Sequence, residues 1–344
     1  MDPLSDVLSL LKPRSYVSSG FDAGGDWSIQ FSNQQDCMKC YAVVSGECWL
    51  SVDDVAEPVR LRSGECFVLS SGRNFRLASD TALTPVDSGK FFPPAHPGGV
   101  VTVNGGGDFY LVGSRFAVSG RNSGSLLRML PPVVRIRRES EQAALRWSVE
   151  RMREELREQR PGSSLIAQHL AHMMLVLALR LHLDDGPAVG AGWFFALADK
   201  QLGAAISAIH ADPGYRWTLR ELAERAGMCR SSFALRFKET VGETAMDYLA
   251  RWRMLLAGDR FENTAEPVSV VALSLGYESE SAFSTAFKRV MGCTPRQYGR
   301  DASLPRDPPD GTGPAQADRQ GPVPLRIRHE RGRVPSPMMR ASRT

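Results

Sequence analysis

At 344 residues the chain is long enough for two domains, and contents of 42% hydrophobic and 23% charged residues are those of a globular protein with a sizeable core. The formal net charge of +4 only slightly favours an anionic partner. Charge alone therefore does not indicate nucleic-acid binding.

The sequence does not predict secretion or a membrane span. Its first residues are acidic and contain neither a long apolar run nor a cleavage site, so we expect no signal peptide. The most apolar segment, residues 165–183, is interrupted by Gln, His and Arg, whereas a bilayer span needs about 20 largely apolar residues. This segment predicts a buried helix. The six cysteines are expected to stay reduced. We expect a cytoplasmic protein with no membrane partner.

Short β-rich runs broken by turn residues occupy about residues 27–117. They include CYAVVSGECWLSV, EPVRLRSGECFVLS, NFRLAS and GGVVTVNGGGDFYLVGSRFAV. Their alternation and closely spaced Gly and Asp predict an antiparallel all-β unit, a small barrel or sandwich. Residues 80–97 contain four prolines and predict a loop.

Two stretches, GECWLSVDD and EPVRLRSGECFVLSSGRNFRLASD, resemble the central strands of the cupin-type sensor domain of many AraC-family regulators. Metal-binding cupins place histidines and a carboxylate at the barrel mouth, but here Ser70 replaces the motif's Pro and Phe75 its His. The histidines lie elsewhere, at positions 96, 169, 172, 182, 210 and 329. We therefore expect no metal and no cofactor, and a pocket for a signal or effector instead of cupin enzymology.

Cys37 and Cys40 form a C-x-x-C pair with Lys39 between them, and a nearby cation favours the reactive thiolate. The pair predicts a redox sensor if it lies at a junction between loop and strand. Within one strand, residues three apart point to opposite faces and do not bridge easily. Cys48 and Cys66 stand in strand-like runs and are expected to be small buried hydrophobic residues.

The sequence then becomes helical, with apolar residues at helical spacing over 139–159 and over 163–183. We expect these helices to connect two domains and to support dimerisation, as in the AraC family. His169 and His172 are three apart, a spacing that can share a metal ion. The Leu, Met and Val around them favour a role in the core or in a dimer interface.

An internal repeat occupies residues 219–238, LRELAERAGMCRSSFALRFK, and 268–288, VSVVALSLGYESESAFSTAFK. In each copy an apolar-Ala pair precedes a glycine by four residues, and a polar cluster and Phe-x-x-x-Phe-Lys follow. Gly227 and Gly276 suit a turn with φ > 0 between two helices. The copies are offset by 49 residues up to the glycine and by 50 after it.

Each copy predicts a helix-turn-helix whose second helix is anchored by two phenylalanines on one face. These pairs are Phe233 with Phe237 and Phe283 with Phe287. The serines just before them are expected N-caps. One unit alone is also typical of an ordinary αα-hairpin. Two units joined by a long helix over about 243–261 favour the geometry that fits a major groove.

The segment from WTLRELAERAGMCRSSFALRFK to GYESESAFSTAFKRVMGCTPRQYGR resembles the DNA-binding domain of AraC/XylS-family transcription regulators. The resemblance implies two helix-turn-helix motifs that read successive major-groove faces of double-stranded DNA. By position it assigns base contacts to Arg230, Ser231, Ala234 and Leu235 on the first recognition helix, and to Glu280, Ser281, Ser284 and Thr285 on the second. Lys238, Lys288 and Arg289 are expected to contact phosphates or to be solvated.

The chemistry of these side chains suits base recognition unevenly. Arg230 can pair with a guanine edge and Glu280 can accept from a cytosine amine, whereas Leu235 offers only apolar contact to a thymine methyl. We therefore expect the second motif to carry more of the specificity.

Residues 205–300 contain 13 basic and 11 acidic side chains, so attraction to DNA has to come from charge placed on one face. Residues 301–344 are rich in Pro, Gly and Arg and poor in core formers. They predict a disordered basic tail that adds nonspecific DNA affinity.

Together these features predict a two-domain α+β protein. Its expected parts are a cupin-like antiparallel β-barrel sensor (1–125), a helical connector that supports dimerisation (126–197), an all-α double helix-turn-helix domain (198–300) and the tail (301–344). The expected function is sequence-specific transcription regulation, as an activator, in response to a small-molecule effector or to an oxidant acting on cysteines. The expected partners are promoter DNA, RNA polymerase and a second copy of the chain. A metal-independent cupin-type enzyme and a nonspecific DNA-binding protein are the alternatives.

Overall fold

The computed structural model describes residues 2–32, 34, 37–70, 72–92, 99–118, 121–136, 143–184 and 192–302. The predicted tail over 301–344 and the end of the predicted loop over 80–97 therefore fall mostly outside the described residues.

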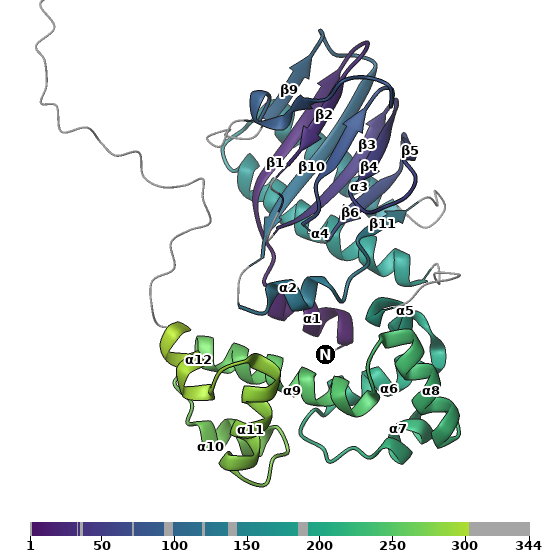
Figure 1. Cartoon of the computed structure of the whole chain (residues 1–344). Coiled ribbons are helices and arrows are strands. Elements are labelled where there is room, and N and C mark those ends of the chain that lie inside the picture. Colours follow the sequence, from purple (N-terminus) through teal and green to yellow (C-terminus); the bar gives the residue numbers. More distant parts are fainter. Residues whose placement is uncertain are drawn as a thin grey trace, which may run out of the picture. The chain divides into compact units, whose positions relative to one another are not determined.

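Two sheets form the N-terminal part of the protein (Figure 1). The six-stranded sheet has the order β11-β6-β3-β10-β1-β9, and the five-stranded sheet has the order β5-β4-β7-β2-β8. Their bounds are β1 (Arg14–Ala23), β2 (Ser28–Phe31), β3 (Cys37–Ser45), β4 (Glu47–Val52), β5 (Val59–Arg62), β6 (Cys66–Leu69), β7 (Phe75–Ala78), β8 (Val86–Asp87), β9 (Gly99–Val103), β10 (Phe109–Ala117) and β11 (Val133–Ile136).

Most strand pairs are antiparallel, as predicted, but β1 pairs with β9 and β2 with β8 in parallel. Alternation of apolar and polar residues indicates a strand and its buried face, and it carries no information on strand direction. A parallel pair needs a long crossover connection, and here both connections run through strands of the two sheets. The all-antiparallel expectation is therefore corrected at these two edges.

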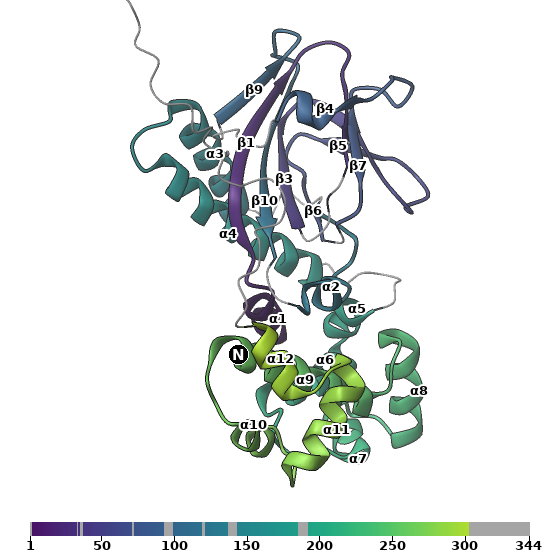
Figure 2. The same cartoon turned by 60° about the vertical axis from the view of Figure 1, so that its left-hand side comes forward.

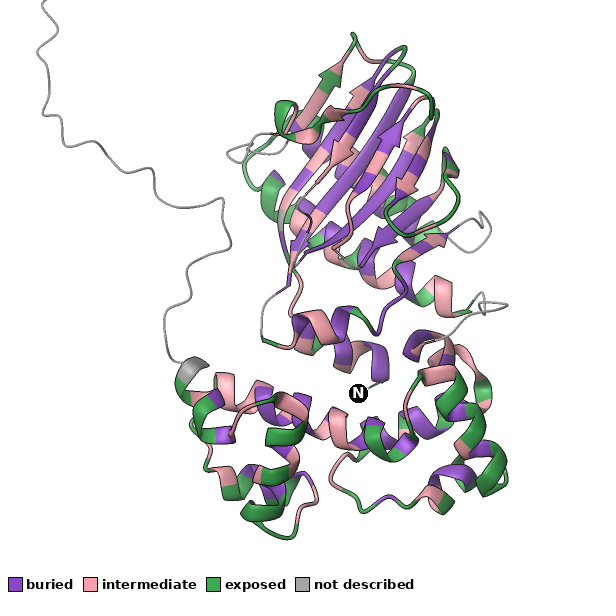
Figure 3. Ribbon diagram, viewed as in Figure 1, coloured by how far each residue is buried: buried purple, intermediate pink, exposed green. Residues whose placement is uncertain are grey.

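The central strands β3 and β10 of the six-stranded sheet are buried along most of their length, as the colouring of Figure 3 shows. On β3, Tyr41 and Val43 belong to the core that also holds residues of the five-stranded sheet, such as Leu77. Cys40 and Ala42 on the same strand belong to a second core that includes the helices. This two-faced burial follows the period of two along a strand.

The helices α3 (Ala143–Glu158) and α4 (Ser163–Asp184) pack on each other and on the six-stranded sheet (Figures 1 and 2). Among the described residues, α4 is the one helix whose length and composition would allow it to cross a membrane. Core helices of soluble proteins meet the same two criteria. The α4 residues Leu170, Met174 and Leu175 are buried in the same core as strand residues. This is the environment of a core helix, as the sequence predicts.

The remaining helices of the C-terminal part are short except for one. They are α5 (Trp193–Ala198), α6 (Lys200–Ala211), α7 (Leu219–Arg225), α8 (Arg230–Val241), α9 (Ala245–Asn263), α10 (Val268–Ser274), α11 (Glu280–Met291) and α12 (Pro295–Ala302). The long helix α9 starts two residues later than predicted because the Thr244 hydroxyl caps it, accepting from the Asp247 N–H at 3.2 Å. The α+β prediction is confirmed.

One helix is missing from the sequence-based prediction. Residues Pro3–Leu11 form α1, with Asp2 as N-cap accepting from the Ser5 N–H at 3.0 Å. Its buried residues Leu4, Val7 and Leu11 share a core with α6 and α9, and it also contacts α2 (Ser123–Leu127). A 3-10 turn, Ser88–Lys90, completes the description.

Candidate functional site

The first helix-turn-helix consists of α7 and α8. Thr218 and Glu221 form a reciprocal capping box at the start of α7, and Gly227 makes the turn with φ +62°. Cys229 is the N-cap of α8 and makes no capping hydrogen bond, so Ser231 and the next serine lie inside the first helical turn. The prediction that these serines are N-caps is wrong for this motif, because the helix starts one residue earlier than the serines.

The second helix-turn-helix consists of α10 and α11. Gly276 makes the turn with φ +79°, and the Ser279 hydroxyl caps α11 by accepting from the Ala282 N–H at 3.2 Å. Here the N-cap prediction is confirmed. Each recognition helix is held by its phenylalanine pair, and these are fully buried: Phe233, Phe237, Phe283 and Phe287.

The residues predicted to face DNA lie on the outer side of α8 and α11, where Figure 3 shows exposed surface. Ala234 and Ser284 are half-buried. The others are exposed: Arg230, Ser231, Leu235, Lys238, Glu280, Ser281, Thr285, Lys288 and Arg289. Leu235 is 61% exposed, which is unusual for a leucine without a partner surface.

Charge on this outer side is mostly uncompensated. Among the described residues, no ion-pair partner lies within 4.0 Å of four cations: Arg230, Lys238, Lys288 and Arg289. Glu280 lies 3.6 Å from Arg296, and Arg236 pairs with Asp199 at 2.5 Å. The exposed cations are therefore available to phosphate groups, whereas Arg236 is engaged within the protein.

Contacts that the sequence analysis missed hold the two motifs together. Arg253 on α9 donates to the Pro213 carbonyl at 2.6 Å and to the Tyr215 carbonyl at 2.7 Å, and its guanidinium lies over the Tyr277 ring. A Cβ at Gly276 would lie 2.2 Å from the carbonyl oxygen of Gly214. The second turn thus packs against the loop that precedes the first motif. No local pattern reveals this, because the partners are distant in sequence.

Cys229 is a further group at this surface that was assigned no role. Hydrogen bonding with the hydroxyls of Ser231, at 3.5 Å, and Ser232, at 3.1 Å, lowers the pKa of its thiol to about 7. The thiol is exposed at the start of the first recognition helix. Its thiolate fraction near neutral pH is therefore substantial.

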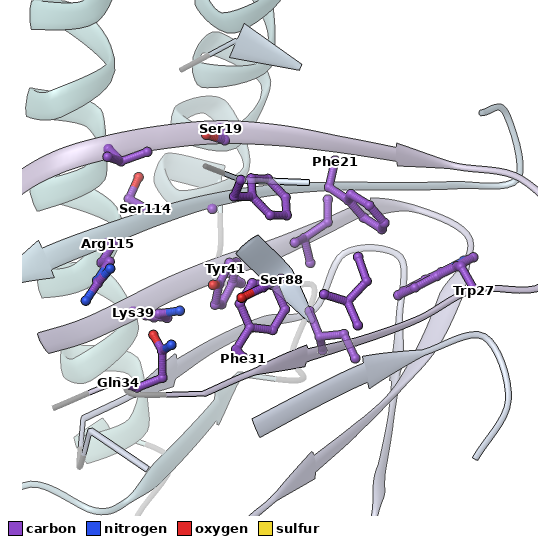
Figure 4. A pocket seen from close by; sticks show the side chains of 16 residues that line it. Ser19, Phe21, Trp27, Phe31, Gln34, Lys39, Tyr41, Ser88, Ser114 and Arg115 are labelled. Atoms are coloured by element: carbon purple, nitrogen blue, oxygen red, sulfur yellow. The ribbon is translucent and has the colours of Figure 1, made fainter. Parts of the chain in front are cut away.

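A cavity of about 180 Å³ lies between the two sheets. Its walls combine aromatic and aliphatic side chains with several polar ones. The aromatic residues are Phe21, Trp27, Phe31, Tyr41 and Phe92, and the polar ones include Ser19, Gln34, Lys39 and Arg115. Figure 4 shows Gln34, Lys39 and Arg115 at one end, and Phe21 and Trp27 at the other. Gly113 leaves room for this arrangement, because a Cβ there would lie 2.2 Å from the Tyr41 ring.

Lys39 is buried at the polar end, with 5% of its surface exposed. Loss of hydration lowers the pKa of its amine to about 7, and the positive charge of Arg115 acts in the same direction while Cys37 opposes it. Its Nζ lies 4.6 Å from the ring centroids of both Phe31 and Phe75. In the sequence this lysine is marked only by its position between two cysteines.

The predicted redox pair lies within β3, and its two thiols belong to opposite faces of that strand. Cys40 is instead close to Cys66, with 3.9 Å between the sulfurs. The hydrogen bond with Cys66, followed by burial, raises the pKa of the Cys40 thiol. Burial also raises the pKa of Cys48, to about 12. Cys48 and Cys66 are buried, as expected, while redox activity of Cys37 and Cys40 stays a prediction.

Metal-ligating side chains are scattered in the described part of the chain, where no group of three His, Cys, Asp or Glu residues is placed to hold an ion. His172 Nε2 lies 2.5 Å from the Pro13 carbonyl and Nδ1 lies 2.8 Å from that of Gln168. His169 is exposed on α4. Both histidines thus lie at a core edge or a surface.

A buried polar chain joins α1 to the first half of the helical part. His210 Nδ1 lies 3.0 Å from the Asp6 carboxylate, and its Nε2 lies 2.6 Å from the Tyr248 hydroxyl. That hydroxyl accepts from the indole N–H of Trp193 at 2.7 Å. Burial lowers the pKa of His210, so the ring is neutral at pH 7. A second link, from Lys12 Nζ to the Asp259 carboxylate, measures 2.6 Å.

Comparison with known proteins gives two family matches. A family described as cupin matches residues 2–184, and a helix-turn-helix domain family matches residues 222–301. The chain is 40% identical over 306 residues to an AraC-like transcription regulator of Streptomyces lividans, covering 89% of this chain and 100% of that protein. It is 42% identical over 299 residues to an AraC-like transcription regulator of Streptomyces antibioticus, covering 87% and 98%. The DNA-binding domain of the global transcriptional factor AdpA, solved in complex with a target DNA, is 27% identical with a TM-score of 0.28, covering 30% of this chain and 92% of that one.

Proposed function

Because this chain belongs to the AraC family of transcription regulators, with an N-terminal cupin domain and a C-terminal helix-turn-helix domain, we propose that it binds specific promoter sequences under the control of a signal sensed by the cupin domain. It is a DNA-binding regulator and not an enzyme. The alternative of a cupin-type enzyme is thereby set aside.

The observation that carries the proposal is the pair of exposed recognition faces with uncompensated cations. On α8, Arg230 is the first residue of the helix, and on α11 Glu280 has the same place. N-terminal residues of a recognition helix are those that enter the major groove. Arg230 then reads a guanine edge, Glu280 accepts from a cytosine amine, and Lys238, Lys288 and Arg289 contact phosphates.

The proposal predicts that Arg230→Ala and Glu280→Ala each weaken binding to a specific site by roughly 1–3 kcal/mol and relax specificity at one base position. The full chain is first footprinted on DNA upstream of its own gene. Affinities for the protected site and for base-substituted sites are then measured at one salt concentration.

Arg62→Ala and Glu57→Ala are matched controls, because both side chains are exposed in the cupin domain. They should leave affinity unchanged. A footprint without sequence preference, or equal losses on all sequences for Arg230→Ala and Glu280→Ala, would favour the nonspecific DNA-binding alternative.

We also propose that the chain dimerises through α3 and α4. Four large apolar residues on these helices are exposed: Trp147 (59%), Leu165 (57%), Ile166 (40%) and Met173 (37%). Positions 166 and 173 are seven apart and share a helix face with the exposed His169. Sedimentation of Ile166→Glu should show monomer if this face forms the interface, and an unchanged dimer would sink the idea.

Cysteine oxidation is a second candidate signal, favoured by the Lys39 amine near Cys37. The opposite orientation of Cys37 and Cys40 within β3 argues for separate thiols rather than a bridge between them. A Cys37→Ser/Cys40→Ser double variant that keeps its full response to oxidant would exclude both.

We propose that the protein acts in the bacterial cytoplasm, where its DNA lies, and that it activates transcription by contact with RNA polymerase. Mobility of the promoter complex on addition of polymerase tests this contact.

A further inference from the structure

The cavity in the cupin domain has a charged end and an apolar end. Lys39 on β3 and Arg115 on β10 are directly paired across the six-stranded sheet, so two positive side chains face each other at the charged end. At the other end, Trp27 packs on Phe21 and Phe109 with ring centroids 5.0 Å apart in both pairs.

Lys39 lacks an anionic partner within the described residues. No carboxylate there lies within 4.0 Å of its Nζ, which lies 4.6 Å from the ring centroids of Phe31 and Phe75. Buried lysines are rare unless they are paired, because burial of an uncompensated ammonium is costly. The Ser19 hydroxyl, which lines the same cavity, is also buried without a hydrogen-bond partner in the described part of the chain.

We propose that the cavity binds a small apolar monocarboxylate, whose carboxylate accepts from Lys39 Nζ and whose ring or short chain lies against Phe21 and Trp27. The inference rests on the proposed function, since it names the class of signal that the cupin domain senses. A carboxylate at this end compensates the buried ammonium of Lys39 through a charge-assisted hydrogen bond.

The size of the cavity limits the ligand. An apolar cavity of about 150 Å³ holds one benzene molecule. The 180 Å³ found here therefore suits a single ring with a short acid arm and is too small for a nucleotide.

Three probes of equal shape test the charge requirement: 3-phenylpropionate, the neutral 3-phenylpropanol and the cationic 3-phenylpropylammonium. Calorimetric titration of the full chain at pH 6.5 should show the acid binding about tenfold or more tighter than the alcohol. The ammonium should not bind, because it places a second positive charge beside the buried Lys39 amine.

Lys39→Met removes the charge and keeps the length of the side chain. It should reduce the preference for acid over alcohol to less than about threefold while the alcohol still binds. Lys39→Arg should keep a preference for the acid, and the exposed Lys90→Met is the matched control that should keep it in full. Thermal unfolding confirms that each variant is folded.

Equal affinity for acid and alcohol in the native chain would overturn the inference. So would an acid preference that survives Lys39→Met, or no heat of binding for the acid up to about 1 mM. These outcomes are separate from the footprint in the absence of any probe. If the chain footprints its site but binds no acid, the ligand class is wrong and the regulator stands; if it binds the acid but no DNA, the proposed function fails.

Discussion

The role that the sequence predicts for Lys39 differs from the role that its surroundings in the fold indicate. In the sequence it is a cation between two cysteines, and that view predicts activation of a thiol. In the fold its side chain lies on the inner face of β3 with Tyr41, in a cavity formed by residues from five or more distant segments. Burial rather than the cysteines dominates its pKa of about 7.

That pKa predicts a pH dependence of ligand affinity. Among the residues that the structure describes, the titratable groups facing Lys39 are Cys37 on its own strand, Arg115 on β10 and Tyr41 in the cavity wall. In the empty cavity the amine loses its proton as the pH rises through about 7, and a bound carboxylate raises the pKa again. Affinity for 3-phenylpropionate should therefore be highest below pH 7 and fall steadily toward pH 9.

Titration at several pH values measures this directly, with Lys39→Arg as the control. An arginine stays protonated over this whole range, so its affinity for the acid should not change with pH. A native affinity that is flat between pH 6 and 9 would mean that Lys39 does not meet the carboxylate.

At the scale of the element, the two helix-turn-helix motifs were predictable because their determinants are local. Phenylalanines four apart share a helix face, and a glycine with φ > 0 ends a helix, whatever surrounds them. The error at the start of α8 concerned one residue, since both Cys229 and a serine can precede a helix. Local sequence patterns did not reveal that the turn at Gly276 is packed against other backbone whereas the turn at Gly227 is open.

This inequality predicts different costs for the same substitution. Gly227→Ala places a Cβ where no described atom lies within 4 Å, so its cost is the left-handed backbone alone, about 1–2 kcal/mol. Gly276→Ala adds a clash of 2.2 Å with the Gly214 carbonyl. Thermal unfolding of both variants should show the larger loss for Gly276→Ala.

DNA affinity measured below the unfolding temperature separates the effect of each substitution on DNA binding from its effect on stability. Gly276→Ala should weaken binding more than Gly227→Ala, because it displaces α11 relative to the loop that Arg253 holds. Equal losses of stability for the two variants would show that the contact with Gly214 relaxes freely.

At the scale of the whole molecule, α1 connects the cavity to the DNA-binding helices. The chain passes from α1 directly into β1, and β1 carries Ser19 and Phe21 of the cavity wall. In the other direction α1 contacts α6 and α9 through Asp6 and Lys12. A change in β1 on ligand binding is thus placed to alter the docking of α1.

The double variant Asp6→Asn/Lys12→Met tests this connection. It removes both charged links of α1 while the apolar contacts of Leu4, Val7 and Leu11 stay. Hydrogen exchange in α6 and α9 should increase, and 3-phenylpropionate should bind as before but no longer change DNA affinity. Coupling between the cavity and the DNA-binding helices requires contacts that differ between the ligand-free and ligand-bound states. The contacts of Asp6 and Lys12 are the candidates for this difference.

Asp53→Asn/Lys90→Met is the matched control, since it makes the same changes of charge at exposed sites of the cupin domain. It should keep both the exchange pattern and the ligand effect. If the α1 variant also keeps the ligand effect, the signal travels by another route.

The sequence by itself determined the order of the cupin and helix-turn-helix parts and the repeat within the second part. Helix caps, turns and i, i+4 contacts involve residues that are close in sequence, so the spacing of residue types is enough to predict them. The α+β class followed for the same reason, from a change of hydrophobic period along the chain.

Only the tertiary structure decided the parallel edges β1–β9 and β2–β8, the helix α1 and the cavity around Lys39. Each depends on segments far apart in the chain, as with Lys39 and Arg115 or Asp6 and His210. The burial and the pKa of these side chains depend on how distant segments pack together. Hydrophobic periodicity describes each segment separately and therefore does not predict them.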